Sequence, residues 1–367
     1  MTAVREKKEA LGRNTNRIPW IDALRAIAMF TIVLGHTLRG ESVYYYLYAF
    51  HVPLCVMISG FCFSKQDSIK QYCLKLVKRE YLPYLGFSLL SIVVYVIMSP
   101  IVEGKSTITE LPNYLLGMVY GNGYFGIENG GYMRWNLPLW YLPFVVLLQI
   151  LAACVYKIYS RAESIQEAVV VFVVSVLVGW AFWRFIGRTF NGPFAVETVI
   201  MLFPFFAAGQ LLKRLLKNHR MCEQYTAGST FNSVGGVIIV LGLILSRMNG
   251  NVDYVCDIYG RNYLVFLIAA ILISGGLFII VPLLPNISMA QYFGKHTLWV
   301  LGLHKFPIMV FTVFFVSRFE VIRNHILIIS ILVSFGTIAA CLISEFLFKV
   351  ARDLLIYSIR KKLESKV

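Results

Sequence analysis

The chain has 367 residues, of which 58% are hydrophobic and 14% are charged, and its formal net charge is +15. Soluble globular domains are about 45–50% apolar and about 25% charged, so this composition excludes a soluble enzyme, a disordered protein and a disulfide-stapled secreted domain. It predicts an all-α fold, a polytopic membrane bundle of helices.

The transmembrane helices can be placed by their length, because a hydrocarbon core of about 30 Å requires about 20 apolar residues per helix. No connecting segment is long enough to fold alone, so we expect one membrane domain at 18–350 between a basic N-terminal tail at 1–17 and a basic C-terminal tail at 351–367. We predict about ten helices, at 20–38, 43–63, 81–102, 136–156, 166–184, 193–212, 231–246, 263–284, 297–317 and 326–348.

The basic residues are unevenly distributed along this predicted topology. If the N-terminus is cytoplasmic, most of the 34 Lys and Arg residues fall in segments on the inner side. This distribution follows the positive-inside rule, and it predicts that both termini are cytoplasmic. The basic charge is thereby explained by topology and by the anionic inner leaflet. We therefore expect the lipid bilayer, and no nucleic acid, as a partner.

The seven cysteines, Cys222 among them, contain no Cys-x-x-Cys pair. We expect them to be small packing residues, and we expect neither a metal site nor a disulfide framework.

The first predicted helix contains three ionisable residues, Asp22, Arg25 and His36. Such residues are costly within a membrane and often indicate function. Asp22 and Arg25 are three apart and can pair on one helix face. Arg25 and His36 are eleven apart, close to three full turns, so they share a face and are separated by roughly 16 Å along the axis. The pattern is consistent with a purely structural ion pair or with a catalytic or binding stripe.

The second predicted helix enters from the outer side, so His51 falls at a depth similar to that of His36. Pro53 and the pair Ser59 and Gly60 allow bending and close helix approach. Two histidines on adjacent helices can share a polar cavity. The alternative is that His51 bonds a backbone carbonyl released by Pro53.

Aromatic residues flank the outer end of the fourth predicted helix. Trp135 and Trp140 lie where interfacial aromatics normally anchor a helix. Arg134 beside them is expected to be a solvated loop charge.

Four further polar residues fall within predicted helices. His304 and Lys305 are adjacent, so they face different directions and need not act together. Glu197 and Glu345 are expected to be structural.

Several of these segments together resemble the acyltransferase 3 family of multi-pass membrane acyltransferases, especially its fucose 4-O-acetylase-like branch. The resemblance covers roughly residues 17–350, and it departs from the usual pattern at Ala26, Cys55 and Lys305. The motifs that carry it are Ile21-Asp22-Ala-Leu-Arg25 through His36, Phe50-His51-Val-Pro53-Leu54 through Ser59-Gly60-Phe61, Leu139-Trp140-Tyr141-Leu142, Phe203-Pro-Phe205-Phe206 to Gly209, and Gly294-Lys-His-Thr-Leu298 to His304.

The resemblance implies an O-acyltransferase of the bacterial cytoplasmic (inner) membrane. Its donor would be a cytoplasmic acyl-CoA, usually acetyl-CoA, and its acceptor a hydroxyl of an extracytoplasmic cell-envelope glycan or glycolipid, with no tightly bound cofactor. The family's pattern places the chemistry at His36, as general base or acyl carrier, with Arg25 binding the donor or stabilising the oxyanion and Asp22 orienting Arg25. It places substrate binding at His51, Trp140, Ser59 and His304.

Two other functions remain open at this point. One is a transporter, flippase or exporter of a polysaccharide precursor, which buried charges favour and the absence of sequence repeats disfavours. The other is a non-enzymatic membrane scaffold. The acyl group, acetyl or succinyl, and the identity of the acceptor also remain open.

Overall fold

The structure is a computed structural model of the chain. Residues 1–16 of the predicted N-terminal tail and Cys222 lie outside its described residues. The described residues are 17–38, 41–126, 128, 131–158, 164–187, 190–218, 229–316, 319 and 325–364.

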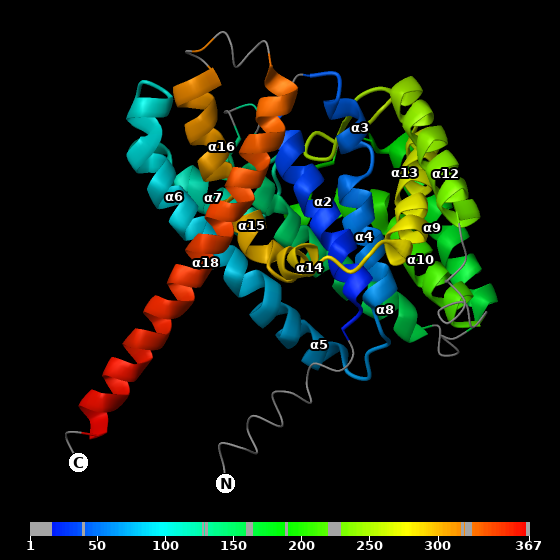
Figure 1. Cartoon of the computed structure of the whole chain (residues 1–367), viewed down its shortest axis with the longest axis horizontal. Coiled ribbons are helices and arrows are strands. Elements are labelled where there is room, and N and C mark those ends of the chain that lie inside the picture. The colour runs from blue at the N-terminus through cyan, green and yellow to red at the C-terminus, as the bar shows by residue number, and fades with distance from the viewer. Residues whose placement is uncertain are drawn as a thin grey trace.

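The first half of the chain is mainly helical (Figure 1). A π-helical turn at Val77–Tyr81 joins two of its helices into one rod, and a 3-10 turn at Leu137–Trp140 leads into another. The helices are α2 (Pro19–Thr37), α3 (Tyr44–Tyr48), α4 (His51–Cys62), α5 (Ile69–Leu76), α6 (Leu82–Val102), α7 (Leu111–Tyr120), α8 (Tyr141–Ile158) and α9 (Ile165–Phe185).

The second half continues the bundle and adds one small hairpin. Its strands, β1 (Val252–Asp253) and β2 (Ile258–Tyr259), pair in antiparallel register between two long helices. The helices are α10 (Val196–Asn218), α12 (Ser229–Asn249), α13 (Tyr263–Ile280), α14 (Ser288–Lys295), α15 (Thr297–Leu303), α16 (Lys305–Phe311) and α18 (Ile326–Glu364).

Helices occupy all ten predicted places, but the number of spans is not confirmed as ten. Seven helical stretches in the described part of the chain are long and apolar enough to cross a membrane, or eight if the bent pair α15–α16 counts as one span. α2 is not among them, because Asp22, Arg25 and His36 lower its hydropathy. The chain is a multi-pass membrane protein whose first helix contains three ionisable residues.

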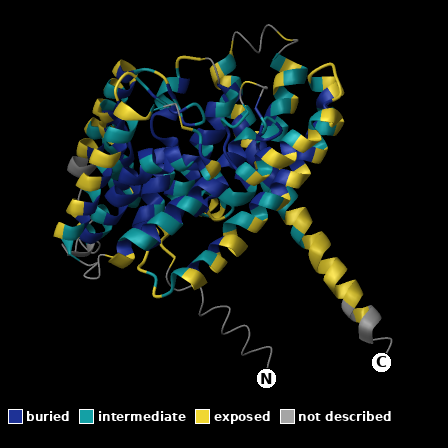
Figure 2. Cartoon of the chain, turned by 180° about the vertical axis from the view of Figure 1, so that it is seen from behind, coloured by how far each residue is buried: buried dark blue, intermediate teal, exposed yellow. Residues whose placement is uncertain are grey.

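The beginning of α2 and the end of α18 lie at the same end of the bundle (Figure 1). The helix α18 continues past residue 350 without a break, and its final part stands away from the other helices with its residues exposed (Figure 2). We refer to the end where α2 begins as the inner end, and to the opposite end as the outer end.

Two close backbone contacts hold α2 and α4 in place. A Cβ atom at Gly60 would lie 2.1 Å from the Phe206 carbonyl oxygen, so the predicted close approach at Gly60 is confirmed. A Cβ atom at Gly294 of α14 would lie 1.8 Å from the Asp22 carbonyl oxygen. Only glycine permits such approaches, and they bring α4 against α10 and α14 against the first turn of α2.

Candidate active site

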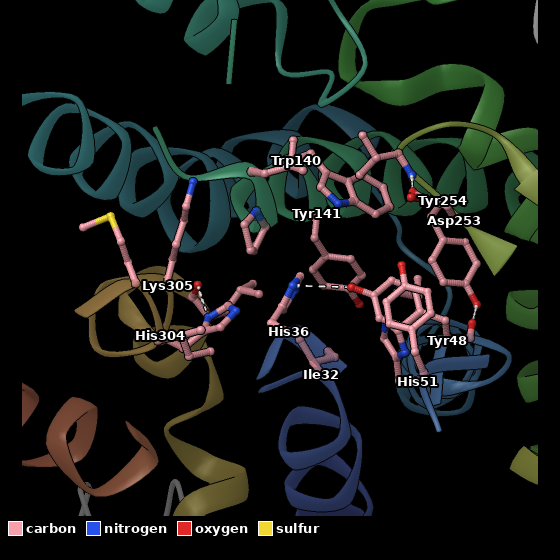
Figure 3. Close-up of a pocket in the computed structure, with 18 of the residues that line it drawn as sticks. Ile32, His36, Tyr48, His51, Trp140, Tyr141, Asp253, Tyr254, His304 and Lys305 are labelled. Atoms are coloured by element: carbon pink, nitrogen blue, oxygen red, sulfur yellow. Dashed lines mark hydrogen bonds between the residues drawn. The ribbon is translucent and has the colours of Figure 1, made fainter. Parts of the chain in front are cut away.

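A cavity of about 410 Å³ opens at the outer end of α2, around His36 (Figure 3). Segments that are far apart in the sequence form its walls: the end of α2, the α3–α4 break, the turn before α8, the β-hairpin and the α15–α16 bend. The residues that line it include His36, Tyr48, His51, Arg134, Trp140, Tyr141, Asp253, Tyr254, His304 and Lys305.

His36 sits in the last turn of α2 and is half-buried. Its Nδ1 lies 3.4 Å from the hydroxyl oxygen of Tyr48, and its ring centroid is 5.3 Å from that of His304. Gly35 makes room for this arrangement, because a Cβ atom there would lie 2.9 Å from the Tyr48 ring. The geometry places a titratable imidazole between a phenol and a second imidazole.

His304 is fully buried at the bend between α15 and α16. Its Nδ1 lies 2.9 Å from the Val300 carbonyl oxygen and 3.0 Å from that of Leu301, so Nδ1 carries the proton and donates it. The Nε2 atom is buried and has no hydrogen-bond partner among the described residues. A neutral imidazole with this tautomer offers one acceptor lone pair to the cavity.

The bend that exposes this nitrogen measures 44° and has a cause in the sequence. Pro307 follows three residues after His304, and a proline has no N–H and clashes with the carbonyl of the residue four positions before it. The helix therefore breaks at His304, whose ring turns toward His36 from the broken turn (Figure 3).

His51 both bonds a backbone carbonyl and lines the cavity, but the carbonyl is that of Leu47 and not the one four residues before Pro53. Its Nδ1 lies 2.7 Å from the Leu47 carbonyl oxygen, so it does bond the backbone at the α3–α4 break. The buried ring also lines the cavity and packs edge-on against Tyr48 and Tyr254, with centroids 4.5 Å and 5.8 Å apart.

The expectations for the tryptophans and for Arg134 were wrong. Trp135 and Trp140 are buried within the bundle rather than anchored at its surface, and Trp140 forms a cavity wall. The Arg134 guanidinium pairs with Glu110 and Glu103 instead of facing solvent. Burial lowers the pKa of Arg134, but the Tyr114 hydroxyl and the two carboxylates outweigh it and raise the pKa above its usual value.

Lys305 also reaches this region. Its ammonium donates a hydrogen bond to the Arg134 backbone carbonyl, and both residues line the cavity beside His304. Adjacent residues of a regular helix face apart, but the bend at His304 brings both side chains to one cavity. His304 and Lys305 therefore line one cavity, although adjacent residues of a helix were expected to face different directions.

Three of the predicted residues lie elsewhere. Asp22 is buried at the inner end of α2 and accepts hydrogen bonds from Arg25 at 2.9 Å and from Arg17 at 2.8 Å. Arg25 also lies 3.6 Å from the Cys62 sulfur. Ser59 donates to the Cys55 carbonyl of its own helix. None of the three predicted residues lines the cavity around His36, so the structure separates an inner Asp22–Arg25 pair from the outer histidines.

The sequence did not single out the outer aromatic and acidic side chains of the cavity. Tyr254 donates to the Tyr48 carbonyl, and the Asp253 carboxylate accepts from the Val255 and Cys256 N–H groups. Burial raises the pKa of Tyr254 well above its usual value, so its hydroxyl remains a donor. Nothing in a single loop segment between two spans marks such residues, because only the folded hairpin brings them to His36.

The two glutamates, Glu197 and Glu345, behave as expected. Glu345 pairs with His296 at 2.8 Å and with Lys349 at 2.6 Å, and Glu197 accepts from Asn122. The contacts with His296 and Asn122 join separate segments, the contact with Lys349 lies within α18, and none of these residues lines the cavity.

Comparison with known families gives one match. A family model described as an acyltransferase domain, of the acyltransferase 3 family, matches residues 18–345. Comparison with curated proteins and with solved structures gave no match. The matched region contains the whole cavity and the inner Asp22–Arg25 pair, and together with the helical bundle it indicates a membrane acyltransferase. Because the match covers most of the chain, the protein belongs to the acyltransferase 3 family.

Proposed function

We propose that this protein is a membrane O-acyltransferase of the fucose 4-O-acetylase-like branch. In this proposal it moves an acetyl group from cytoplasmic acetyl-CoA to a hydroxyl of an extracytoplasmic cell-envelope glycan, in a bacterial inner membrane. The observation that carries the proposal is the His36 imidazole, which faces the His304 lone pair across an outer cavity while Arg25 lies at the other end of the same helix.

The proposed chemistry begins at His36. Its imidazole takes the proton of the acceptor hydroxyl while the hydroxyl oxygen attacks the thioester carbonyl carbon. The carbon–sulfur bond then breaks, and the imidazolium returns its proton to the CoA thiolate. In the variant in which His36 carries the acyl group, the imidazole nitrogen attacks the thioester carbonyl carbon, the carbon–sulfur bond breaks and CoA leaves as the thiolate. The acceptor hydroxyl then attacks the acyl-imidazole, the carbon–nitrogen bond breaks, and the hydroxyl proton passes to the released imidazole.

The donor end is assigned to the inner half of α2. Arg25 has 35% of its side chain exposed while Asp22 is buried, so the carboxylate holds the guanidinium and leaves part of it accessible. A guanidinium is suited to phosphate groups and to a developing oxyanion. The helix rise places Arg25 and His36 roughly 16 Å apart, a span that an extended pantetheine arm would have to cross.

The acceptor end is assigned to the outer cavity. Aromatic walls with a few fixed polar groups are typical of small-molecule sites, and here Trp140, Tyr141 and Tyr254 supply apolar faces suited to a sugar ring. The His304 Nε2 atom would accept a hydrogen bond from an acceptor hydroxyl, with His51 closing the same wall. Ser59 does not line this cavity, and its hydroxyl donates to a backbone carbonyl of its own helix. It remains a proposed substrate contact, in the inner part of the bundle.

The test is acetyl transfer by purified protein in proteoliposomes with radiolabelled acetyl-CoA and an envelope glycan extract. We expect wild-type protein to release CoA and label the glycan, and His36→Ala to lose both. His325→Ala is the matched control, because His325 is exposed and lies outside the cavity. Normal transfer by His36→Ala would overturn the proposed chemistry, and absence of CoA release by wild type with all glycans tested would favour transport.

Two further measurements complete this test. Succinyl-CoA in place of acetyl-CoA identifies the acyl group by the rate of CoA release. Incubation with labelled acetyl-CoA without acceptor, followed by rapid quenching, distinguishes the two roles of His36: label retained on the wild-type protein but not on His36→Ala identifies an acyl carrier, and its absence identifies a general base.

A further inference from the structure

A second cavity lies at the inner half of the bundle, away from His36. Its volume is about 510 Å³. Two helix pairs form its sides, α9 with α10 and α12 with α13, and its floor contains Trp20 of α2 and Met57 of α4. These pairs pack together on one side of the molecule (Figure 1).

The two helix pairs are joined at the outer end. The Tyr263 hydroxyl at the start of α13 donates to the Met201 carbonyl of α10 at 2.8 Å. Its ring stacks on Trp183 near the end of α9, and a Cβ atom at Gly179 would lie 2.5 Å from its hydroxyl oxygen. The cavity lies at the opposite end, toward Leu215 of α10 and Ile279 of α13, so the two pairs form a wedge that opens toward the inner leaflet.

The lining disfavours water and polar ligands. Among the described residues that line the cavity, none has a charged or hydroxyl-bearing side chain, and the walls are aliphatic and aromatic. A buried water requires two to four polar partners, and an unfilled apolar space loses its dispersion contacts. Of the helices around it, α9, α10, α13 and α4 taken together with α3 are long and apolar enough to cross a membrane. In the hydrocarbon core that such helices cross, lipid chains are the abundant apolar molecules.

We propose that this cavity binds the hydrocarbon chain of one membrane lipid from the inner leaflet. The chain packs between α10 and α13 and reaches Trp20, whose ring contacts Phe278 edge-on with centroids 5.9 Å apart. Trp20 lies in the first turn of α2, two residues before Asp22. The bound chain therefore completes the packing that positions the inner end of this helix. The proposal stands on the cavity alone and does not rest on the acyl-transfer chemistry.

Gly275 provides a direct test, because it lines the cavity and a Cβ atom there would meet no atom within 4 Å. Gly275→Phe fills the space from α13. Gly336→Phe is the matched control, since Gly336 also has open space, is exposed on α18 and lies outside the cavity. Leu215→Trp narrows the cavity from the opposite wall, where Leu215 is 38% exposed, and serves if Gly275→Phe does not fold.

The probe is a phosphatidylcholine with a photoreactive diazirine in one chain, mixed into proteoliposomes of phosphatidylethanolamine and phosphatidylglycerol. After irradiation, cross-linked peptides are mapped by mass spectrometry, with Leu332 of α18 as the exposed, lipid-facing reference. We expect label at Phe172 and Leu215 to exceed that at Leu332. We expect it to fall at least about tenfold, equivalent to about 1.4 kcal/mol, in Gly275→Phe and not in Gly336→Phe.

Equal labelling of the cavity and of Leu332, or undiminished cavity labelling in folded Gly275→Phe and Leu215→Trp, would overturn the proposal. A parallel sample receives diazirine palmitoyl-CoA instead of the lipid. Cavity labelling from that probe but not from phosphatidylcholine would assign the cavity to an acyl donor and reject a membrane lipid. These readouts measure binding, so they remain informative even if acetyl transfer is not found.

Discussion

The His304 side chain shows how a backbone interruption can define the chemistry of one atom. Two carbonyls of the preceding turn fix the proton on Nδ1, and Nε2 is left as a buried acceptor facing the His36 cavity. A buried acceptor without a partner is unfavourable, and a substrate hydroxyl would satisfy it. The Nε2 atom therefore lowers the stability of the protein without substrate, and in the proposed reaction it binds the acceptor.

Two substitutions at His304 distinguish the role of its Nε2 atom from that of its Nδ1 atom. Glutamine places an amide group near Nε2, whereas asparagine places one near Nδ1 and leaves the Nε2 position empty. We expect His304→Asn to lower kcat/KM for the glycan acceptor at least about tenfold, because a hydrogen bond worth about 1.4 kcal/mol is lost, and His304→Gln to retain much more activity.

Initial rates at varied glycan concentration measure this difference, with the KM for acetyl-CoA as the internal control. Equal losses in the two variants, or a change confined to the acetyl-CoA KM, would show that His304 does not contact the acceptor.

At the scale of elements, the contact between α14 and α2 has no tolerance for a side chain. α14 is a short helix that the apolar stretches of the sequence did not predict, and Gly294 brings its backbone against the Asp22 carbonyl. The position of the Asp22–Arg25 pair therefore depends on a segment distant in the sequence.

We expect Gly294→Ala to destabilise the protein by about 1–3 kcal/mol through overpacking, and to lower the apparent melting temperature in detergent. Gly86→Ala is the comparison, because a Cβ atom at Gly86 of α6 meets nothing within 4 Å and alanine is the better helix former. A Gly294→Ala protein that melts with the wild type would mean that α14 does not press against α2.

The elements also show where prediction from sequence stops. Apolar stretches of sufficient length located every long helix, because hydropathy is a local property. The bend at His304 and the packing of Gly294 on α2 depend on tertiary contacts. Arg134 was misassigned for the same reason: its partners Glu103 and Glu110 lie in the connection between α6 and α7, and nothing local to Arg134 indicates them.

At the scale of the whole molecule, the proposed function requires a fixed orientation. The Asp22–Arg25 pair and the His36 cavity lie at opposite ends of α2, so donor and acceptor must approach from opposite sides of the membrane. The distribution of Lys and Arg predicts that the Asp22–Arg25 end is cytoplasmic.

Cysteine substitutions at two exposed loop positions test this orientation. Glu41 lies beyond the outer end of α2, and Asp67 lies in the loop before α5 at the inner end. In intact cells we expect a membrane-impermeant maleimide to label Glu41→Cys, and to label Asp67→Cys only after permeabilisation. The wild-type chain measures the background from its own cysteines. The reverse pattern would invert the topology and place the histidine cavity on the cytoplasmic side.

The sequence by itself determined that the chain is a helical membrane bundle and that Asp22, Arg25 and His36 are the ionisable residues of its first helix. Composition and helical spacing are local properties that can be read without knowledge of the fold. Only the tertiary structure decided that His51, Trp140 and His304 meet His36 while Ser59 does not, and that Arg134, Lys305 and the β-hairpin complete the cavity. The set of residues in the cavity depends on close backbone approaches between distant segments, and such approaches have no signature in any one stretch of sequence.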